Sequence, residues 1–215
     1  MTITLEARWF GDAPPPRSLQ DWIGQLDPET HETWTDFYLL SEDPGLNLKA
    51  RDNKIQVKRR LAGPTACTFG PGVSGHYEQW VKWSFDRETE GAGPWSENST
   101  GLWIPTRKTR HQRTFDAEAQ SMLASALPIH PAVKVKMELT TFVVSEKEAW
   151  TLCLETEGPP EGLADTLSAA GEALLDADFP VPLAADQSLG YVRWLQRHPE
   201  VQPRPIPELL VTKPE

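Results

Sequence analysis

The chain has 215 residues, of which 39% are hydrophobic and 24% charged, and its net charge at neutral pH is -10. This length favours one sizeable domain with its own core, and the acidic balance argues against broad nucleic-acid binding, which needs a basic surface. No apolar run approaches the ~18 residues that a membrane helix needs. The N-terminus shows no signal-peptide pattern. The two cysteines, Cys67 and Cys153, cannot form a disulfide framework, which favours a cytoplasmic location.

In chain order, hydrophobic periodicity predicts about eight strands, with helices at the start, middle and end. Strands are expected at 2–10, 33–41, 45–52, 54–61, 76–86, 102–115, 132–144 and 148–157. Helices are expected at 18–26, 116–126, 161–175 and 188–197, and the Gly- and Pro-rich stretches 62–75 and 87–101 are expected to be loops. Because no regular strand–helix–strand alternation appears, the expected fold class is α+β with predominantly antiparallel strands.

Several of these strands carry charges of one sign at a spacing of two residues. Successive side chains of a strand point to opposite faces, so each such pair shares a surface. The basic pairs are Lys49 with Arg51, Lys58 with Arg60, and Lys134 with Lys136, and the acidic pair is Glu155 with Glu157. An acidic chain that arranges its basic residues in this way suggests a site for a polyanion.

Two interpretations of this pattern remain open. A sheet with one solvated face also alternates charged and apolar residues, and its charges then simply face water. Alternatively, helices cover the outside of a closed sheet, so that its apolar face looks outward and its charges line the interior. The apolar stripes of the last two helices favour the second interpretation, as does the separation of the two signs onto different strands, because solvated faces tend to mix signs.

The charged segments resemble the motifs of the CYTH superfamily, also called triphosphate tunnel metalloenzymes. That family has E-x-E-x-K on its first strand, then R-x-R, a lysine on the next strand, K-x-R, and a closing E-x-E. The similar elements here are Thr4-x-Glu6-x-Arg8, Lys49-x-Arg51, Lys58 with Arg60, Lys108-Thr109-Arg110 and Glu155-x-Glu157. Segments 37–39 and 190–195 are also similar, and the resemblance covers residues 2–197. The chain departs from the pattern at Thr4, Arg8 and Lys49, where the family has glutamate, lysine and arginine.

The resemblance implies a fold and a set of site residues. The implied fold is a tunnel-like barrel of about eight strands with helices packed outside, over residues 1–198, followed by a Pro-rich tail over 199–215. The implied phosphate contacts are Arg8, Lys49, Arg51, Lys58, Arg60, Lys82, Lys108, Arg110, Lys134 and Lys136. The implied ligands of Mg²⁺ or Mn²⁺ are Glu6, Glu138, Glu155 and Glu157, of which Glu6, Glu155 and Glu157 would also be the catalytic residues. Arg59 falls in the apolar register and is expected outside the site.

The leading hypothesis is a divalent-metal-dependent hydrolase of inorganic triphosphate or of an organic triphosphate. Such catalysis works mostly by positioning and charge stabilisation, without a protein nucleophile. The alternative is a catalytically degenerate protein that binds triphosphate, polyphosphate or a nucleotide, because Thr4 removes one carboxylate from the metal site. A third hypothesis is a ligand-carrying barrel or interaction module whose charges all face solvent. The expected partner is a triphosphate-containing small molecule, with no nucleic-acid duplex and no membrane, and the expected state is a monomer or homodimer.

Overall fold

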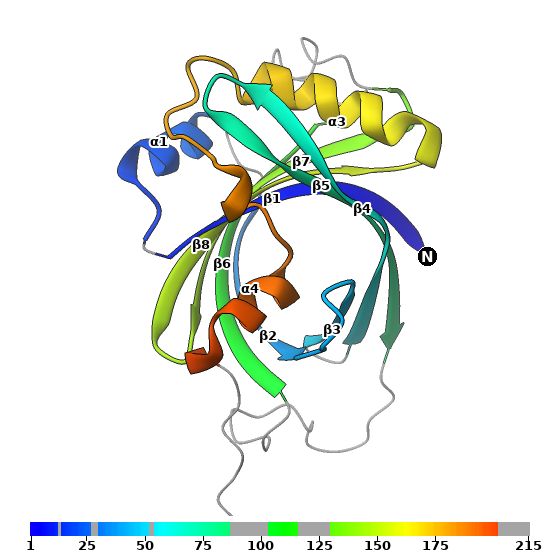
Figure 1. Cartoon of the computed structure of the whole chain (residues 1–215), viewed down its shortest axis with the longest axis vertical. Helices are drawn as coiled ribbons and strands as arrows, with labels where there is room; N and C mark the ends of the chain where they lie inside the picture. The colour runs from blue at the N-terminus through cyan, green and yellow to red at the C-terminus, as the bar shows by residue number, and fades with distance from the viewer. Residues whose placement is uncertain (13, 27–29, 52–53, 87–102, 116–129, 202–215) are drawn as a thin grey trace, which may run out of the picture.

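Eight antiparallel strands form a closed barrel in the computed structural model of this chain (Figure 1), which describes residues 1–12, 14–26, 30–51, 54–86, 103–115 and 130–201. Around the barrel the strands follow the order β1-β5-β4-β3-β2-β6-β7-β8, and β8 pairs with β1 to close the ring. The strands are β1 (Thr2–Gly11), β2 (Thr30–Leu39), β3 (Leu46–Arg51), β4 (Lys54–Gly70), β5 (Val73–Asp86), β6 (Trp103–Phe115), β7 (Lys134–Val144) and β8 (Lys147–Glu157). The predicted fold class, an α+β tunnel-like barrel, is confirmed.

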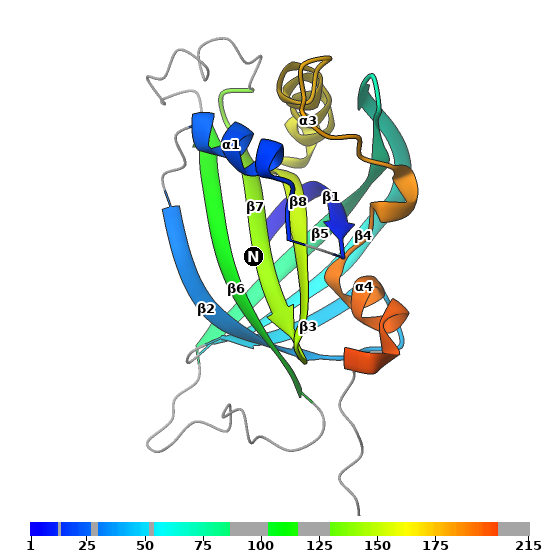
Figure 2. The ribbon, with the colours of Figure 1, turned by 90° about the vertical axis from the view of Figure 1, so that its left-hand side faces the viewer.

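Apolar side chains on the outside of the barrel pack against two helices (Figure 2), α1 (Arg17–Gln25) and α3 (Pro160–Leu174). On β1 the outward residues include Leu5 and Trp9, whereas Glu6 and Arg8 between them face the interior. Helix α1 has only nine residues, which is too short to be stable alone in water. It is held by packing, because a fully buried leucine such as Leu19 contributes about 1.5–3 kcal/mol relative to an exposed one.

A third helix, α4 (Tyr191–Arg197), lies across one end of the barrel rather than on its outside (Figure 1). Tyr191 and Trp194 pack against inward-facing residues of the strands, among them Phe10 and Phe142. The short 3-10 helices η1 (Ala185–Gln187) and η2 (Pro199–Val201) flank α4 in the sequence. We call this end of the barrel the closed end.

The sequence-based prediction of a loop at 62–75 is wrong, because β4 and β5 continue through it and turn only at residues 71–72. Glycine and proline in this stretch coincide with irregular pairing, and the register shifts between Arg60 and Ala62 and again between Ala62 and Thr65. Bulges tolerate these residues within a strand, so the Gly-Pro sequence marks a bulged hairpin.

The predicted helix at 116–126 and loop at 87–101 lie outside the described residues, as does most of the predicted tail. No described helix is long and apolar enough to cross a membrane.

Candidate functional site

The barrel encloses a cavity of about 180 Å³, which we call the tunnel. Ten of the fourteen predicted site residues line it. Seven of these are basic and three are acidic: Arg8, Lys49, Arg51, Lys58, Lys82, Lys108 and Arg110, with Glu6, Glu138 and Glu155. An excess of fixed positive charge in an enclosed, partly desolvated space favours a polyanionic ligand, because low dielectric strengthens each charge–charge interaction. The roles assigned to these residues remain predictions.

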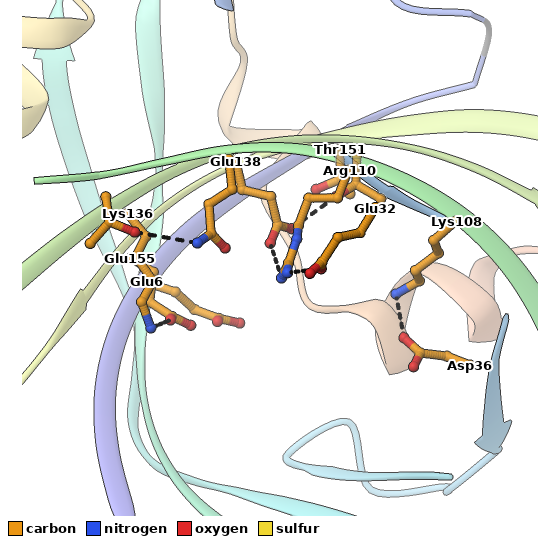
Figure 3. Close-up of polar contacts among 12 residues, drawn as sticks. Glu6, Glu32, Asp36, Lys108, Arg110, Lys136, Glu138, Thr151 and Glu155 are labelled. Atoms are coloured by element: carbon orange, nitrogen blue, oxygen red, sulfur yellow. Dashed lines mark hydrogen bonds and ion pairs between the residues drawn. The ribbon is translucent and has the colours of Figure 1, made fainter. Parts of the chain in front are cut away.

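At the closed end, the Asp36 carboxylate is fully buried and binds three of the tunnel's cations, of which Figure 3 shows Lys108. Its oxygens lie 2.7 Å from Arg51 Nε, 3.1 Å from Lys108 Nζ and 3.4 Å from Lys49 Nζ. Burial raises the pKa of Asp36, but these cations outweigh it and hold that pKa well below its usual range. Asp36 is therefore ionised at neutral pH and gathers three cationic heads at one point.

Lys108 is the most enclosed of these cations. Its ammonium group donates a 2.7 Å hydrogen bond to the Tyr38 hydroxyl and lies 3.5 Å from the centre of the Tyr191 ring. Burial lowers the pKa of Lys108 to about 7, an effect that Asp36 offsets only in part. Burial likewise lowers the pKa of Lys49 to about 8. These two lysines can thus change charge near neutral pH, unlike a solvated lysine.

In the middle of the tunnel, Lys58 lies between two carboxylates. Its Nζ is 3.0 Å from Glu6 Oε2 and 3.5 Å from Glu155 Oε2. The two glutamates are directly opposite each other in the β1–β8 pairing, which brings both side chains to the same depth. Burial lowers the pKa of Lys58, but Glu6 and Glu155 outweigh this and raise it above its ordinary value. Lys58 therefore stays charged at neutral pH.

Two arginines and Glu138 form a second ionic group. Arg8 Nη1 lies 3.2 Å from Glu138 Oε1, and Arg110 Nη1 lies 3.5 Å from Glu138 Oε2. Arg110 also reaches Glu32 at 2.6 Å (Figure 3). Burial raises the pKa of Glu138, but the neighbouring Arg8 and Arg110 lower it overall, so this carboxylate is ionised. It is therefore already paired with two cations.

Lys108, which contacts the Tyr191 ring of α4, is 4% exposed, whereas Glu155 is 17% and Glu157 30% exposed. We call the more exposed end, where Lys136 bridges Glu155 at 3.4 Å and Glu157 at 2.5 Å, the tunnel mouth. Lys136 and Glu157 belong to the mouth rather than to the cavity wall.

Two further predicted phosphate contacts lie away from the cavity. Lys134 is exposed at the start of β7. Arg60 pairs with Glu78 at 2.5 Å and is not among the residues that line the cavity. Arg59 pairs with Asp43 on the exterior, which agrees with its predicted register.

Several buried donors that belong to cavity-lining residues have no hydrogen-bond partner within the described part of the chain. They are Trp34 Nε1, Trp80 Nε1, Arg8 Nε and Arg110 Nε. The Trp34 ring also lies 4.2 Å from the Arg51 guanidinium and 4.9 Å from that of Arg110. Buried donors in folded proteins nearly always have a partner. Acceptor oxygens of a ligand or of ordered water can supply these.

The sequence interpretation missed Asp36, Glu78 and Tyr191. A signal for Asp36 was present, because residues 34, 36 and 38 alternate with outward-facing neighbours, and a lone carboxylate between Trp34 and Tyr38 is unusual for a solvated face. Glu78 shares the inward register of β5 with Trp80 and Lys82. Tyr191 could not be placed, because nothing in a short helix indicates that it closes a barrel end.

The residues of this site can be tested against the divalent metal that the sequence resemblance implies. Within the described ranges, no three His, Cys, Asp or Glu side chains form a ready-made metal cluster. Thr4, where the family has glutamate, is buried, and its hydroxyl has no partner. Mg²⁺, however, usually uses only one or two carboxylates together with phosphate oxygens and waters. The opposed pair Glu6 and Glu155 fits a metal that is held jointly with a phosphate ligand.

Comparisons with known proteins give distant matches. No family model and no curated protein matches the sequence. Among solved structures, the Hippeastrum protein HpAC1, for which a dominant triphosphatase activity is described, is 10% identical; the alignment covers 81% of this chain and 88% of that one, with a TM-score of 0.38. The Pct1 RNA triphosphatase of S. pombe is 11% identical, with 81% of each chain covered and a TM-score of 0.32. Its structure with the Spt5 CTD is 13% identical, covers 93% of this chain and 81% of that one, and has a TM-score of 0.28.

Proposed function

We propose that this protein binds a triphosphate group inside the tunnel and hydrolyses it with the help of Mg²⁺ or Mn²⁺. The observation that carries the proposal is the tunnel's lining of seven basic and three acidic residues, together with buried donors that lack partners. A triphosphate carries several negative charges along a short line, so it needs several cations at different depths. Arginine can grip two phosphate oxygens at once, whereas lysine acts as a point charge.

The chain's own residues divide this work by position. Arg51, Lys49 and Lys108 hold one end of the triphosphate near the closed end, where Asp36 keeps their heads together. Arg8 and Arg110 bind along its length through the guanidinium groups that line the cavity. These fixed charges stabilise the negative charge that shifts between oxygens during phosphoryl transfer, without reorganisation at the moment of reaction.

Glu6 and Glu155 would hold the divalent ion, whereas Glu138 pairs with Arg8 and Glu157 with Lys136. The metal, when bound, would polarise the phosphoryl group and help to orient an attacking water. A protein nucleophile is not part of the proposal. Cys153 faces the same interior, but burial raises the pKa of its thiol well above the ordinary value, with Glu6 and Glu138 adding to that rise despite Arg8, so it is a poor nucleophile.

A second candidate function is binding without turnover. It is supported by Thr4, which supplies no carboxylate, and by Lys58, which already neutralises Glu6 and Glu155. The same tunnel would then hold a triphosphate, polyphosphate or nucleotide as a sensor. The two functions share the phosphate contacts and differ only in what occurs between the two glutamates.

Thermal melting with tripolyphosphate, with and without Mg²⁺ or Mn²⁺, followed by phosphate release from the same samples, tests the proposal. We expect tripolyphosphate to raise the melting temperature, and phosphate to appear only when metal is present. A rise in melting temperature without phosphate release supports the binding protein instead. No change in melting temperature with any triphosphate contradicts both candidates.

A further inference from the structure

The ammonium group of Lys58 occupies the point at which a metal would meet Glu6 and Glu155. It lies 3.0 Å from Glu6 Oε2 and 3.5 Å from Glu155 Oε2, and all three side chains are at most 18% exposed. Two other cations approach the same carboxylates. Arg8 Nη2 is 3.9 Å from Glu6 Oε2, and Lys136 is 3.4 Å from the other oxygen of Glu155 but 2.5 Å from Glu157. Lys58 thus bridges the Oε2 atoms of both carboxylates.

A divalent ion cannot share this position with Lys58. Mg²⁺ needs its oxygen ligands at about 2.0–2.1 Å, so it would have to enter between the same two oxygens that the ammonium contacts. The two cations would then repel each other strongly, because the site is partly desolvated and screening is weak. Metal binding to the empty tunnel therefore requires Lys58 to leave both carboxylates and remain unpaired.

A phosphate ligand changes this balance. Lys58 itself lines the cavity, so phosphate oxygens there offer its ammonium a new partner. When Lys58 turns to the phosphate, Glu6 and Glu155 are released for a divalent ion at the same depth. This step rests on the proposed function, because it needs a phosphate in the tunnel.

We infer that Lys58 is an internal counter-ion which makes divalent-metal binding conditional on the phosphate ligand. The empty protein then binds metal weakly, and metal and triphosphate each increase the affinity of the other by the same factor, as thermodynamic linkage demands. Lys58 acts here as a positioning residue, because it controls when the two glutamates become free. Its effect is on metal affinity in the absence of any reaction.

The test measures Mn²⁺ binding to the full-length protein without phosphate, from the loss of the free Mn²⁺ signal in electron paramagnetic resonance. Wild type is compared with Lys58→Met, which removes the ammonium and keeps a side chain of similar length. We expect Lys58→Met to bind Mn²⁺ alone at least tenfold more tightly than wild type, and the double variant E6Q/K58M to lose that gain. Lys58→Arg keeps the charge and should leave Mn²⁺ affinity at the wild-type level.

Lys82→Met is the matched control for the loss of one positive charge from the electrostatic field of the tunnel. It also removes one positive charge from the cavity wall, but no ion pair joins Lys82 to Glu6 or Glu155 among the described contacts. We expect its gain in Mn²⁺ affinity to stay below threefold. An equal gain from Lys82→Met and Lys58→Met overturns the inference, as does wild type that already binds Mn²⁺ as tightly as Lys58→Met.

Two further points keep the inference separate from the proposed function. If Lys58→Met fails to fold, Lys58→Gln replaces it, since it is neutral but retains a donor for the two carboxylates, and the same tenfold gain is expected. If none of the proteins binds tripolyphosphate, the proposed function fails. The Mn²⁺ comparison between Lys58→Met and wild type still decides whether Lys58 suppresses metal binding.

Discussion

Arg51 donates hydrogen bonds from Nε and Nη2 to the two carboxylate oxygens of Asp36, at 2.7 and 3.2 Å. This two-point contact fixes the plane of the guanidinium, and the same carboxylate also binds Lys49 and Lys108. Asp36 thus supports the closed end of the tunnel from behind, because it is itself fully buried and does not line the cavity. Without the Asp36 carboxylate, Arg51, Lys49 and Lys108 would face one another with no shared counter-ion.

We expect Asp36→Asn to lower the free energy of unfolding by about 3 kcal/mol at pH 7, since breaking a buried ionic group leaves charges uncompensated. The pKa of Asp36 is depressed in the folded protein, so its contribution is present above its unfolded pKa of ~3.9 and is lost as the pH falls. The difference between wild type and variant should therefore shrink below about pH 4. Urea unfolding at several pH values measures it.

Glu32→Gln is the control for this prediction. Glu32 also pairs with a tunnel arginine, Arg110, but its side chain is 53% exposed. We expect Glu32→Gln to lower the free energy of unfolding by at most ~1 kcal/mol, because exposed ion pairs contribute little to stability. If Asp36→Asn and Glu32→Gln lower the free energy of unfolding equally, the burial of Asp36 does not increase its contribution to stability.

Anion affinity should fall as the pH rises through neutrality, because the pKa of Lys108 is about 7 and that of Lys49 about 8. Below pH 7 Lys108 is protonated and attracts phosphate, whereas above it the neutral amine does not. A charge-assisted hydrogen bond contributes about 1.5–3 kcal/mol, so we expect a loss of about tenfold in tripolyphosphate affinity from the Lys108 contact. Calorimetry in the presence of a chelator, from pH 6 to pH 9, measures it.

The variant Lys108→Met isolates this effect. It should bind tripolyphosphate more weakly than wild type at pH 6 and similarly at pH 9, because wild type loses the same charge by titration. The titration of tripolyphosphate itself affects both proteins alike and cancels in their ratio. A ratio of affinities that stays constant across this range would show that Lys108 does not titrate there.

Glu6→Gln should separate metal chemistry from phosphate binding. If hydrolysis depends on metal held by Glu6 and Glu155, this nearly isosteric change should lower metal-dependent phosphate release at least a hundredfold. Tripolyphosphate affinity in a chelator should be retained or increased, because the tunnel loses one negative charge. Phosphate release that persists at the wild-type rate would remove Glu6 from the catalytic role.

Replacing each of two helical glycines by alanine is expected to change the stability of the protein in opposite directions. At Gly24 in α1 no atom lies within 4 Å of a new Cβ, so Gly24→Ala should stabilise the protein by about 0.5 kcal/mol through helix propensity. At Gly171 in α3 the new Cβ would lie 2.1 Å from the ring of buried Phe69. There, overpacking costs typically 1–3 kcal/mol and outweighs a propensity gain of up to about 1 kcal/mol. Thermal unfolding of both variants tests the pair.

Much of the barrel could be predicted from the sequence, because a period of two assigns each strand residue to one of two faces. On β1 this rule correctly separates Glu6 and Arg8 from Leu5 and Trp9. It fails where the pairing is irregular, as after Arg60, because a bulge changes the face to which later residues point. It also cannot distinguish the cavity wall from a strand end, which is why Lys134 was predicted in the site and is exposed.

Contacts between strands distant in sequence could not be predicted. The pairing of Asp36 with Lys108 depends on β2 lying beside β6, although β3, β4 and β5 lie between them in the chain. The position of α4 across the barrel end depends on apolar residues near the ends of several strands, including Phe10 and Phe142. Neither arrangement leaves a periodic signal, because each arises only when the barrel closes.

Helix α4 lies across one end of the barrel, and its residues Tyr191 and Val192 form part of the cavity wall. On the proposed function, a linear phosphate chain would then enter by one terminus from the tunnel mouth, and the products would leave by the same path. A longer polyphosphate would accordingly be shortened stepwise from a chain end. The distance from Glu157 at the mouth to Lys108 at the closed end would then set how many phosphates the tunnel holds at once.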